Sequence, residues 1–196
     1  MTQSAEPDSF LSNDIMQSRI QTSQGDEVTL DEVISDQAAL IVFIRHFGCI
    51  GCSENITLLA QRFDELTRLN IKIVVIGCGP YQFIESFKQR HNLLHSEAVF
   101  LTDQSLEIQK KAGLKYSLWS GFKPKALFEM GRAYVNGHVS DVIQGDIKQQ
   151  AGAIFLNASR QVKLFHRSES LGDHVNTQHI MNVALSSWVA TNDGLT

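Results

Sequence analysis

The stretch ALIVFIRHFGCIGCSENITLLAQRF, residues 39–63, gives the main indication of the fold class. It starts within a continuous apolar run, Ala38–Ile44, which is typical of a strand buried on both faces of a sheet. After two cysteines, apolar residues recur at helical spacing and predict a long helix closed by Asn70; they are Ile56, Leu59, Ala60, Phe63 and Leu66. A second apolar run, Ile71–Cys78, predicts another buried strand. The order strand, loop, helix, strand indicates a βαβ unit with a right-handed crossover.

The rest of the chain predicts further elements around this unit. Listed in chain order, these are a hairpin over 19–29, a short helix starting at Thr29 or Asp31, a helix with Pro80 in its first turn and Phe83, Ile84, Phe87 and His91 on one face, a strand over 97–103, a helix over 104–112 between Asp103 and Gly113, an insertion over 115–145, an antiparallel hairpin over 152–167, and a last amphipathic helix over 180–188. This order is that of the thioredoxin fold. The expected fold class is therefore α/β, with a central mixed sheet flanked by helices in two or three layers.

Length and composition indicate one globular domain. The 196 residues are enough for a full hydrophobic core, and 43% are hydrophobic. We expect a flexible tail over residues 1–14 and a single domain over 15–196. The net charge of −4 and the absence of a Lys/Arg stripe argue against nucleic-acid binding. The longest apolar runs are too short to cross a bilayer, and the polar N-terminus does not resemble a secretory signal.

The chain has only three cysteines, and an odd number cannot pair completely, so a disulfide scaffold is not expected. This favours a reducing, cytoplasmic location. Cys49 and Cys52 lie where a buried strand turns into a helix, and a helix N-terminus stabilises a thiolate. In such CxxC motifs the cysteine pKa falls from about 8.5 to roughly 3.5–7.5. Arg45 and His46 are expected to add positive charge. Cys52 is then placed to attack an oxidised Cys49 and close a disulfide.

Two other interpretations of the cysteines stay open. They could be buried small hydrophobic residues, or half of a zinc site completed by Cys78 and a histidine. Cys78 itself could be a third redox partner, although a plain core thiol is favoured. Among the late histidines His166, His174 and His179, structural or surface roles are favoured over catalysis. The GCGP stretch lacks the glycine spacing of a dinucleotide site.

Five stretches resemble peroxiredoxin-like proteins of the alkyl hydroperoxide reductase/thiol-specific antioxidant superfamily. They are FIRHFGCIGC, VVIGCGP, FLTDQSLEIQKKAGL, GHVSDVIQGDIKQQAGAIFLN and FHRSESLGDHVNTQHIM. The resemblance implies a thioredoxin-like fold, with Cys49 as the peroxide-attacking cysteine and Cys52 as the resolving one. It also shows departures: Val42 stands for the proline and His46 for the threonine of the PxxxTxxC motif, and the later arginine falls near Gln150 or Ala151. Arg45 and His46 are the residues predicted to substitute for these groups.

The sequence therefore predicts a thiol-dependent oxidoreductase that reduces hydroperoxides or disulfides through Cys49 and Cys52, with Arg45 and His46 in supporting catalytic roles. A thioredoxin-type reductant is the expected partner, and no metal or organic cofactor, nucleic acid or membrane is expected. Because sheet edges are expected to be exposed, a homodimer is also an open possibility. The alternative is a non-enzymatic thioredoxin-like module that binds a partner, senses redox state or holds zinc.

Overall fold

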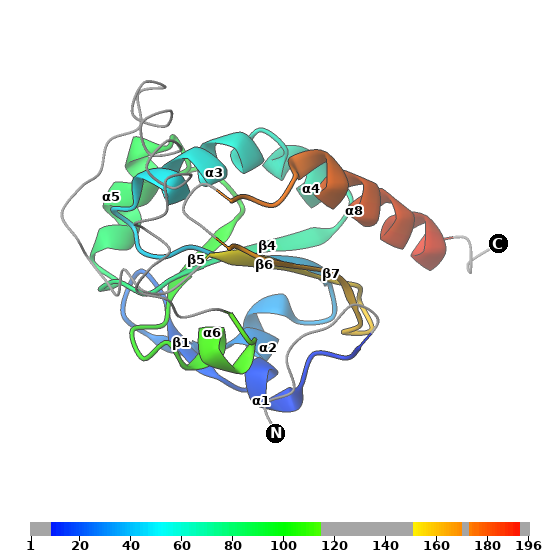
Figure 1. Ribbon diagram of the computed structural model, residues 1–196, viewed down its shortest axis with the longest axis horizontal. Coiled ribbons are helices and arrows are strands. Elements are labelled where there is room, and N and C mark those ends of the chain that lie inside the picture. Colours follow the sequence, from blue (N-terminus) through cyan, green and yellow to red (C-terminus); the bar gives the residue numbers. More distant parts are fainter. Residues whose placement is uncertain (1–8, 115–150, 170–172, 193–196) are drawn as a thin grey trace.

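A computed structural model describes residues 9–114, 151–169 and 173–192. Its centre is a seven-stranded sheet in the order β2-β1-β5-β4-β3-β6-β7 (Figure 1). The strands are β1 (Arg19–Gln21), β2 (Glu27–Thr29), β3 (Ala38–Phe43), β4 (Ile71–Gly77), β5 (Val99–Thr102), β6 (Gly152–Leu156) and β7 (Val162–Arg167). The insertion predicted over 115–145 lies outside the described residues.

The predicted βαβ unit forms the middle of the sheet. Strands β3 and β4 pair in parallel from Ala38↔Ile71 to Phe43↔Ile76, and β4 pairs in parallel with β5. The predicted hairpins are confirmed at the two edges, where β1 and β2 pair antiparallel, as do β6 and β7. Because β6 runs antiparallel to β3, the sheet is mixed, as the sequence predicted.

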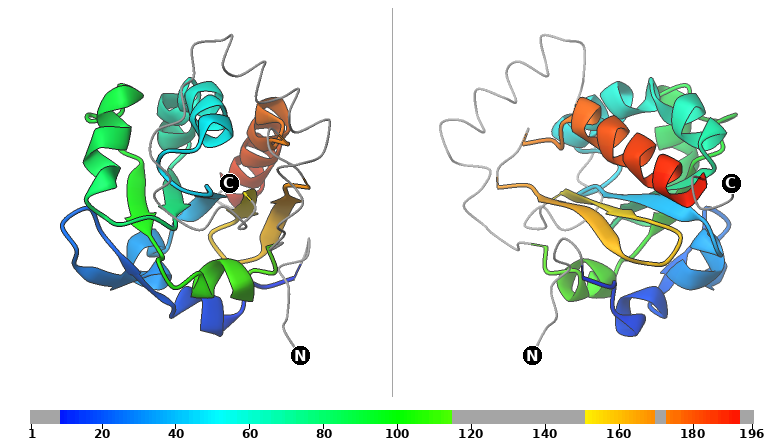
Figure 2. Two further views of the ribbon diagram at one scale, coloured as in Figure 1. Left: turned by 60° about the vertical axis from the view of Figure 1, so that its left-hand side comes forward. Right: turned by 90° about the vertical axis from the view of Figure 1, so that its right-hand side faces the viewer.

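Helices cover both faces of the sheet and make three layers (Figures 1 and 2). One face carries α3 (Ile50–Ala60), α4 (Phe63–Arg68), α5 (Phe83–Arg90) and α8 (Thr177–Asn192); the other carries α1 (Asn13–Met16), α2 (Leu30–Ile34) and α6 (Glu107–Lys111). Alternate residues of each central strand point into two separate cores: Leu40 and Val42 face α3, α4, α5 and α8, while Ile41 and Phe43 face the opposite helices. This explains why the central strands are continuous apolar runs.

Two helical predictions were wrong in detail. The long helix expected after the cysteines is two helices, because Arg62 leaves helical geometry (φ −112°, ψ 0°) and α4 restarts at Phe63. Phe63 and Leu66 are nevertheless buried, so the apolar spacing indicated the correct face. Pro80 lies in a turn before α5, where its carbonyl accepts from the Phe83 N–H, and is therefore outside the first helical turn.

Local signals at two other helix ends are confirmed. Thr29 caps α2 in a capping box with Glu32. Gly113 has φ +76° and follows the end of α6, where a residue in the left-handed region is common. Asp103, by contrast, is not the N-cap that was predicted for a helix over 104–112, because α6 begins at Glu107 with Leu106 as its N-cap. The Asp103 carboxylate instead accepts from the Ser105 and Ile108 N–H groups and stabilises the turn before the helix.

The N-terminal residues 9–12 lie against the turn between β6 and β7. Phe10 forms a bridge with Gln161, and the Leu11 N–H donates to the Arg160 carbonyl. Leu11 is buried. No helix in the described part of the chain is long and apolar enough to span a bilayer.

Candidate active site

The three cysteines lie at one edge of the sheet. Cys49 is the N-cap residue of α3, and Cys52 lies in its first turn. Cys78 directly follows β4, which runs parallel beside β3. The carboxyl ends of neighbouring parallel strands meet at this edge, as the sequence predicted. Cys49 and Cys52 are only 6% and 3% exposed, and none of the three cysteines forms a disulfide.

Phe47 anchors the loop that leads from β3 to Cys49. Its side chain is fully buried and meets Phe87 edge-on, with ring centroids 5.5 Å apart. The Arg90 guanidinium of α5 donates to the Phe47 carbonyl at 3.0 Å. Gly77 leaves space for the ring, because a Cβ there would lie 2.7 Å from Phe47 Cζ. The position of Cys49 therefore depends on contacts with β4 and α5.

The two sulfur atoms of the CxxC motif interact directly. The hydrogen bond that Cys52 shares with Cys49, its burial and the charge of Cys49 together raise the pKa of Cys52 well above its ordinary value. Arg45 acts in the opposite direction: its charge lowers the pKa of Cys52, and its backbone N–H donates to Cys52 Sγ at 3.2 Å. The predicted cysteine pair and Arg45 are thus brought together.

Cys78 also contacts Arg45. Its thiol donates to the Arg45 carbonyl. Cys52 and Cys78 therefore hydrogen-bond to the two backbone polar groups of one residue, which is itself buried.

The prediction that His46 carries a positive charge was wrong. Burial and the charge of Arg45 lower the pKa of His46 to about 4, so its imidazole is neutral near pH 7. Its Nδ1 accepts from the Gly48 N–H at 3.3 Å, which leaves the ring proton on Nε2. His46 is therefore a neutral hydrogen-bond donor beside the cysteine loop.

The sequence did not predict the two histidines from other parts of the chain that contact polar side chains of α3. The His91 ring, at the end of α5, lies 3.2 Å from both the Ser53 and the Thr57 hydroxyls of α3. Glu54, buried two residues after Cys52, lies 3.6 Å from His174 Nε2. His91 shared the predicted apolar face of its helix, so the sequence signalled only that it points inward.

The late histidines do not form one cluster. His174 pairs with Glu54. His166, near the end of β7, lies 3.9 Å from a carboxylate oxygen of Asp173. His179 is exposed on α8. Among the described residues, no group of three or more His, Cys, Asp or Glu side chains is placed to hold a metal ion.

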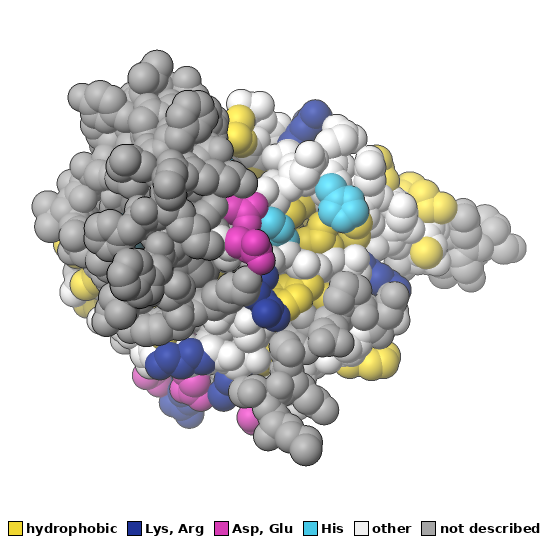
Figure 3. Space-filling model, viewed as in Figure 1, with side chains coloured by type: hydrophobic (Ala, Val, Ile, Leu, Met, Phe, Trp, Pro, Cys, Tyr) yellow, Lys and Arg dark blue, Asp and Glu magenta, His cyan; other side chains and the backbone are white. Residues whose placement is uncertain are grey.

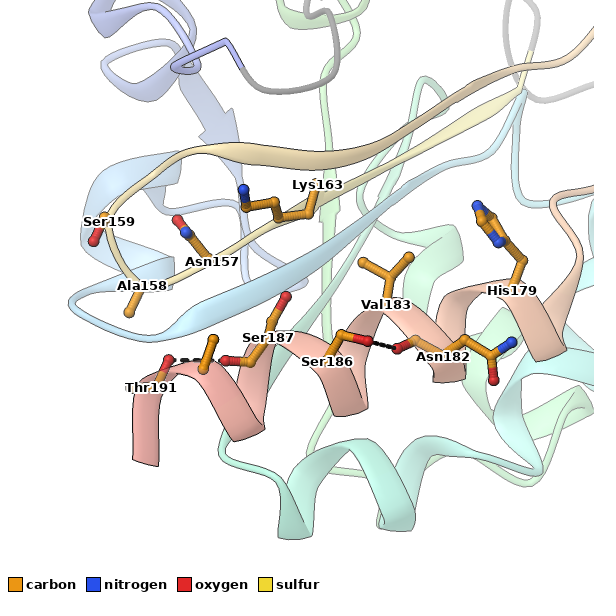
Figure 4. Close-up of a pocket in the computed structure, with 11 residues that line it drawn as sticks. Asn157, Ala158, Ser159, Lys163, His179, Asn182, Val183, Ser186, Ser187 and Thr191 are labelled. Atoms are coloured by element: carbon orange, nitrogen blue, oxygen red, sulfur yellow. Dashed lines mark hydrogen bonds between the residues drawn. The ribbon is translucent and has the colours of Figure 1, made fainter. Parts of the chain in front are cut away.

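The described cavities lie away from the cysteines. A groove of about 670 Å³ separates α8 from the β6–β7 turn, with Lys163 and Asn157 on the turn side and His179 and Asn182 on the helix (Figure 4). A smaller one of about 230 Å³ lies beside Ala38 and Ile71, at the amino ends of β3 and β4. Figure 3 shows acidic and basic side chains interspersed on the visible described surface, without a broad basic area.

Comparison with solved structures supports the fold. A peroxidoxin, BcpB from Mycobacterium tuberculosis, superposes with a TM-score of 0.64 over 95% of this chain and 97% of its own, at 12% sequence identity. The thioredoxin-like fold of the peroxiredoxins is therefore confirmed.

Sequence comparison identifies closer relatives. Human Peroxiredoxin-like 2C is 30% identical over 164 residues, which cover 78% of this chain and 70% of the human protein. The Arabidopsis thaliana protein called "Thioredoxin-like protein AAED1, chloroplastic" is 20% identical, over 81% of this chain and 66% of that protein. The AhpC/TSA antioxidant enzyme model matches residues 58–170, a range that begins after the two cysteines. The fold, the relatives and this match together show that the chain belongs to the AhpC/TSA antioxidant enzyme family, as a peroxiredoxin-like member.

Proposed function

We propose that this protein reduces hydroperoxides with Cys49 as the attacking thiolate and Cys52 as the resolving thiol. The observation that carries the proposal is the interaction between the two side chains. The two contributions of Cys49 that raise the pKa of Cys52, the shared hydrogen bond and the charge, both depend on reduced Cys49. The raised pKa of Cys52 therefore keeps the proton on Cys52 in the reduced protein, and we propose that Cys49 is the cysteine that reacts as a thiolate.

The first step, oxidation of Cys49, removes the effect of the Cys49 charge on Cys52. The Cys49 thiolate attacks the terminal peroxide oxygen, the O–O bond breaks, and the alkoxide leaves and takes up a proton. Cys49 is now a neutral sulfenic acid, so its charge no longer opposes ionisation of Cys52. The charge and N–H of Arg45 still favour a thiolate at Cys52. Oxidation of Cys49 thereby removes the opposing charge and lowers the pKa of Cys52, although burial of Cys52 still raises it.

The second step closes the disulfide. The Cys52 thiolate attacks the Cys49 sulfur and expels hydroxide, which leaves as water after protonation. Because Cys52 already contacts Cys49 within the first turn of α3, closure needs little rearrangement. A thioredoxin-type dithiol then restores both thiols by two exchange steps.

Arg45 and His46 support these steps in different ways. Arg45 supplies positive charge and a backbone donor to Cys52. Neutral His46 offers an Nε2–H donor at the position where the PxxxTxxC pattern has a hydroxyl donor, and we propose that it hydrogen-bonds a peroxide oxygen. Replacing His46 by Gln, which keeps a donor, should preserve more activity than replacing it by Ala.

The test follows both cysteines in one tryptic peptide, His46–Arg62. Reduced protein is treated with hydroperoxide, remaining thiols are blocked, and the peptide mass is measured. We expect an internal disulfide that thioredoxin reverses. Cys49→Ser should abolish turnover with thioredoxin, thioredoxin reductase and NADPH, and Cys52→Ser should leave Cys49 as a sulfenic acid that dimedone traps. Full turnover in Cys49→Ser would refute the mechanism.

Disulfide exchange and redox sensing are the other uses of the same pair. Both thiols remaining unchanged with hydroperoxide, but reacting with small disulfides, would move the protein to the exchange class. A single oxidation without turnover would indicate a sensor. A reducing compartment such as the cytoplasm suits all three uses, and the name of the Arabidopsis relative places that protein in the chloroplast.

A further inference from the structure

We propose that Cys78 is a positioning residue: its thiol holds the Arg45 carbonyl, and so keeps the Arg45 N–H on the sulfur of Cys52. The proposal rests on the proposed role of Cys52 as the thiol that closes the disulfide. It assigns to the third cysteine a function that requires no change in its own oxidation state.

Arg45 lies just beyond the last residue of β3 that pairs in the sheet, so its backbone groups need other hydrogen-bond partners. The last pairs of β3 join Phe43 to Ile76 and Gly152, and the Ile44 N–H still donates to the Ile76 carbonyl at 2.9 Å. Arg45 lies beyond these pairs and is only 6% exposed. Buried backbone N–H and C=O groups require hydrogen-bond partners. At Arg45 two sulfur atoms serve: Cys52 Sγ accepts from the N–H, and the Cys78 thiol donates to the carbonyl.

Arg45 thus links two thiols that come from different elements. Cys52 belongs to α3, whereas Cys78 is the residue that directly follows β4. A bond from a rigid strand end to the Arg45 carbonyl restrains the rotation of the residue. If the carbonyl loses its donor, the Arg45 backbone can turn toward another partner and its N–H leaves the Cys52 sulfur. The thiolate that must attack oxidised Cys49 then loses stabilisation.

The same contact argues against Cys78 as a nucleophile. Only a thiolate attacks a disulfide or a sulfenic acid. The Cys78 proton is engaged with a carbonyl oxygen, and the side chain is buried. A serine at this position keeps the O–H donor but cannot form a disulfide, whereas an alanine of similar size keeps neither property. The two variants therefore separate positioning from redox chemistry.

The experiment measures disulfide closure without hydroperoxide. Wild-type protein, Cys78→Ser and Cys78→Ala are reduced and mixed with an aromatic disulfide that releases coloured thionitrobenzoate. The Cys49 thiolate attacks it, forms a mixed disulfide and releases one thionitrobenzoate; the Cys52 thiolate then attacks the Cys49 sulfur and releases a second. The rate of the second release is recorded from pH 6 to 9, and peptide masses identify the disulfide.

We expect Cys78→Ala to close about fivefold more slowly near pH 7, the effect of roughly one lost hydrogen bond, and to need a higher pH for the same rate. Cys78→Ser should stay within about twofold of wild type. Thermal melts show whether each variant is folded. If the Ala variant is not, Cys78→Val, which also lacks a donor but fills more space, replaces it in the comparison.

Other outcomes of the closure assay overturn the proposal. Equal rates in all three proteins would show that the bond to Arg45 has no effect on closure. Equal slowing in Ser and Ala would indicate that the sulfur itself is required, and a wild-type disulfide containing Cys78 would show a redox role. A wild type that does not close at all refutes both this role and that of Cys52. A wild type that closes normally but ignores hydroperoxides refutes only the peroxidase function.

Discussion

Substitution of Gly77 by Ala tests whether the Phe47 anchor sets the position of the cysteine loop. The backbone of Gly77 is not in the left-handed region, so Ala is conformationally acceptable and the effect is steric. The new Cβ would lie 2.7 Å from Phe47 Cζ, and the ring would have to retreat by about 0.7 Å to reach an ordinary 3.4 Å contact. Phe87 and the Arg90 bond restrict that retreat.

Overpacking of this kind typically costs about 1–3 kcal/mol of unfolding free energy, which corresponds to a fall in Tm of roughly 2–12 °C for a domain of this size. Urea denaturation followed by far-UV circular dichroism measures the free energy. The coloured-disulfide assay described above should also show slower closure, because Phe47 lies two residues before Cys49.

A double-mutant cycle identifies the cause. Phe47→Leu removes the ring edge that meets the new methyl group, so Gly77→Ala should cost less in that background, by about 1 kcal/mol or more. If Gly77→Ala leaves the stability unchanged, or if the two substitutions simply add, the ring and the glycine are not in the contact described here.

Two further predictions concern stability. Gln109 is 0% exposed, and within the described part of the chain its two amide atoms have no hydrogen-bond partner; Gln109→Met should therefore raise the unfolding free energy by about 1 kcal/mol and the Tm by roughly 2–4 °C, and a lower Tm would contradict this. His46 has a pKa near 4 in the folded protein against an ordinary 6.5, so the folded state binds fewer protons between these values. Its contribution to stability is complete above pH 6.5 and is lost as the pH falls toward 4, with a slope of at most about 1.4 kcal/mol per pH unit. Urea titrations from pH 4 to 7 should show a flatter profile in His46→Gln, and parallel profiles would refute the burial argument.

Patterns along the chain were sufficient for the elements that carry the site. Continuous apolar runs predicted β3 and β4, and the rule that parallel strands end at one edge placed Cys49, Cys52 and Cys78 together. The break at Arg62 escaped prediction because apolar spacing reports which side of a helix is buried and contains no information on a local change of dihedral angle.

The charge of His46 could not be predicted because it depends on burial. Next to Arg45 in the sequence, it could have been either a second cation or a neutral ring, and only packing decides. The contacts of His91 are likewise non-local, since they join residues 34 and 38 positions apart.

Local periodicity and short motifs were sufficient to predict a mixed sheet, its parallel βαβ centre and the CxxC pair at the start of a helix. The tertiary structure decided how the thiols differ. Burial and the contact with Cys49 keep the proton on Cys52, and the backbone of Arg45 joins Cys52 to Cys78. Such properties arise from desolvation and from hydrogen bonds between elements, which exist only once the chain has folded.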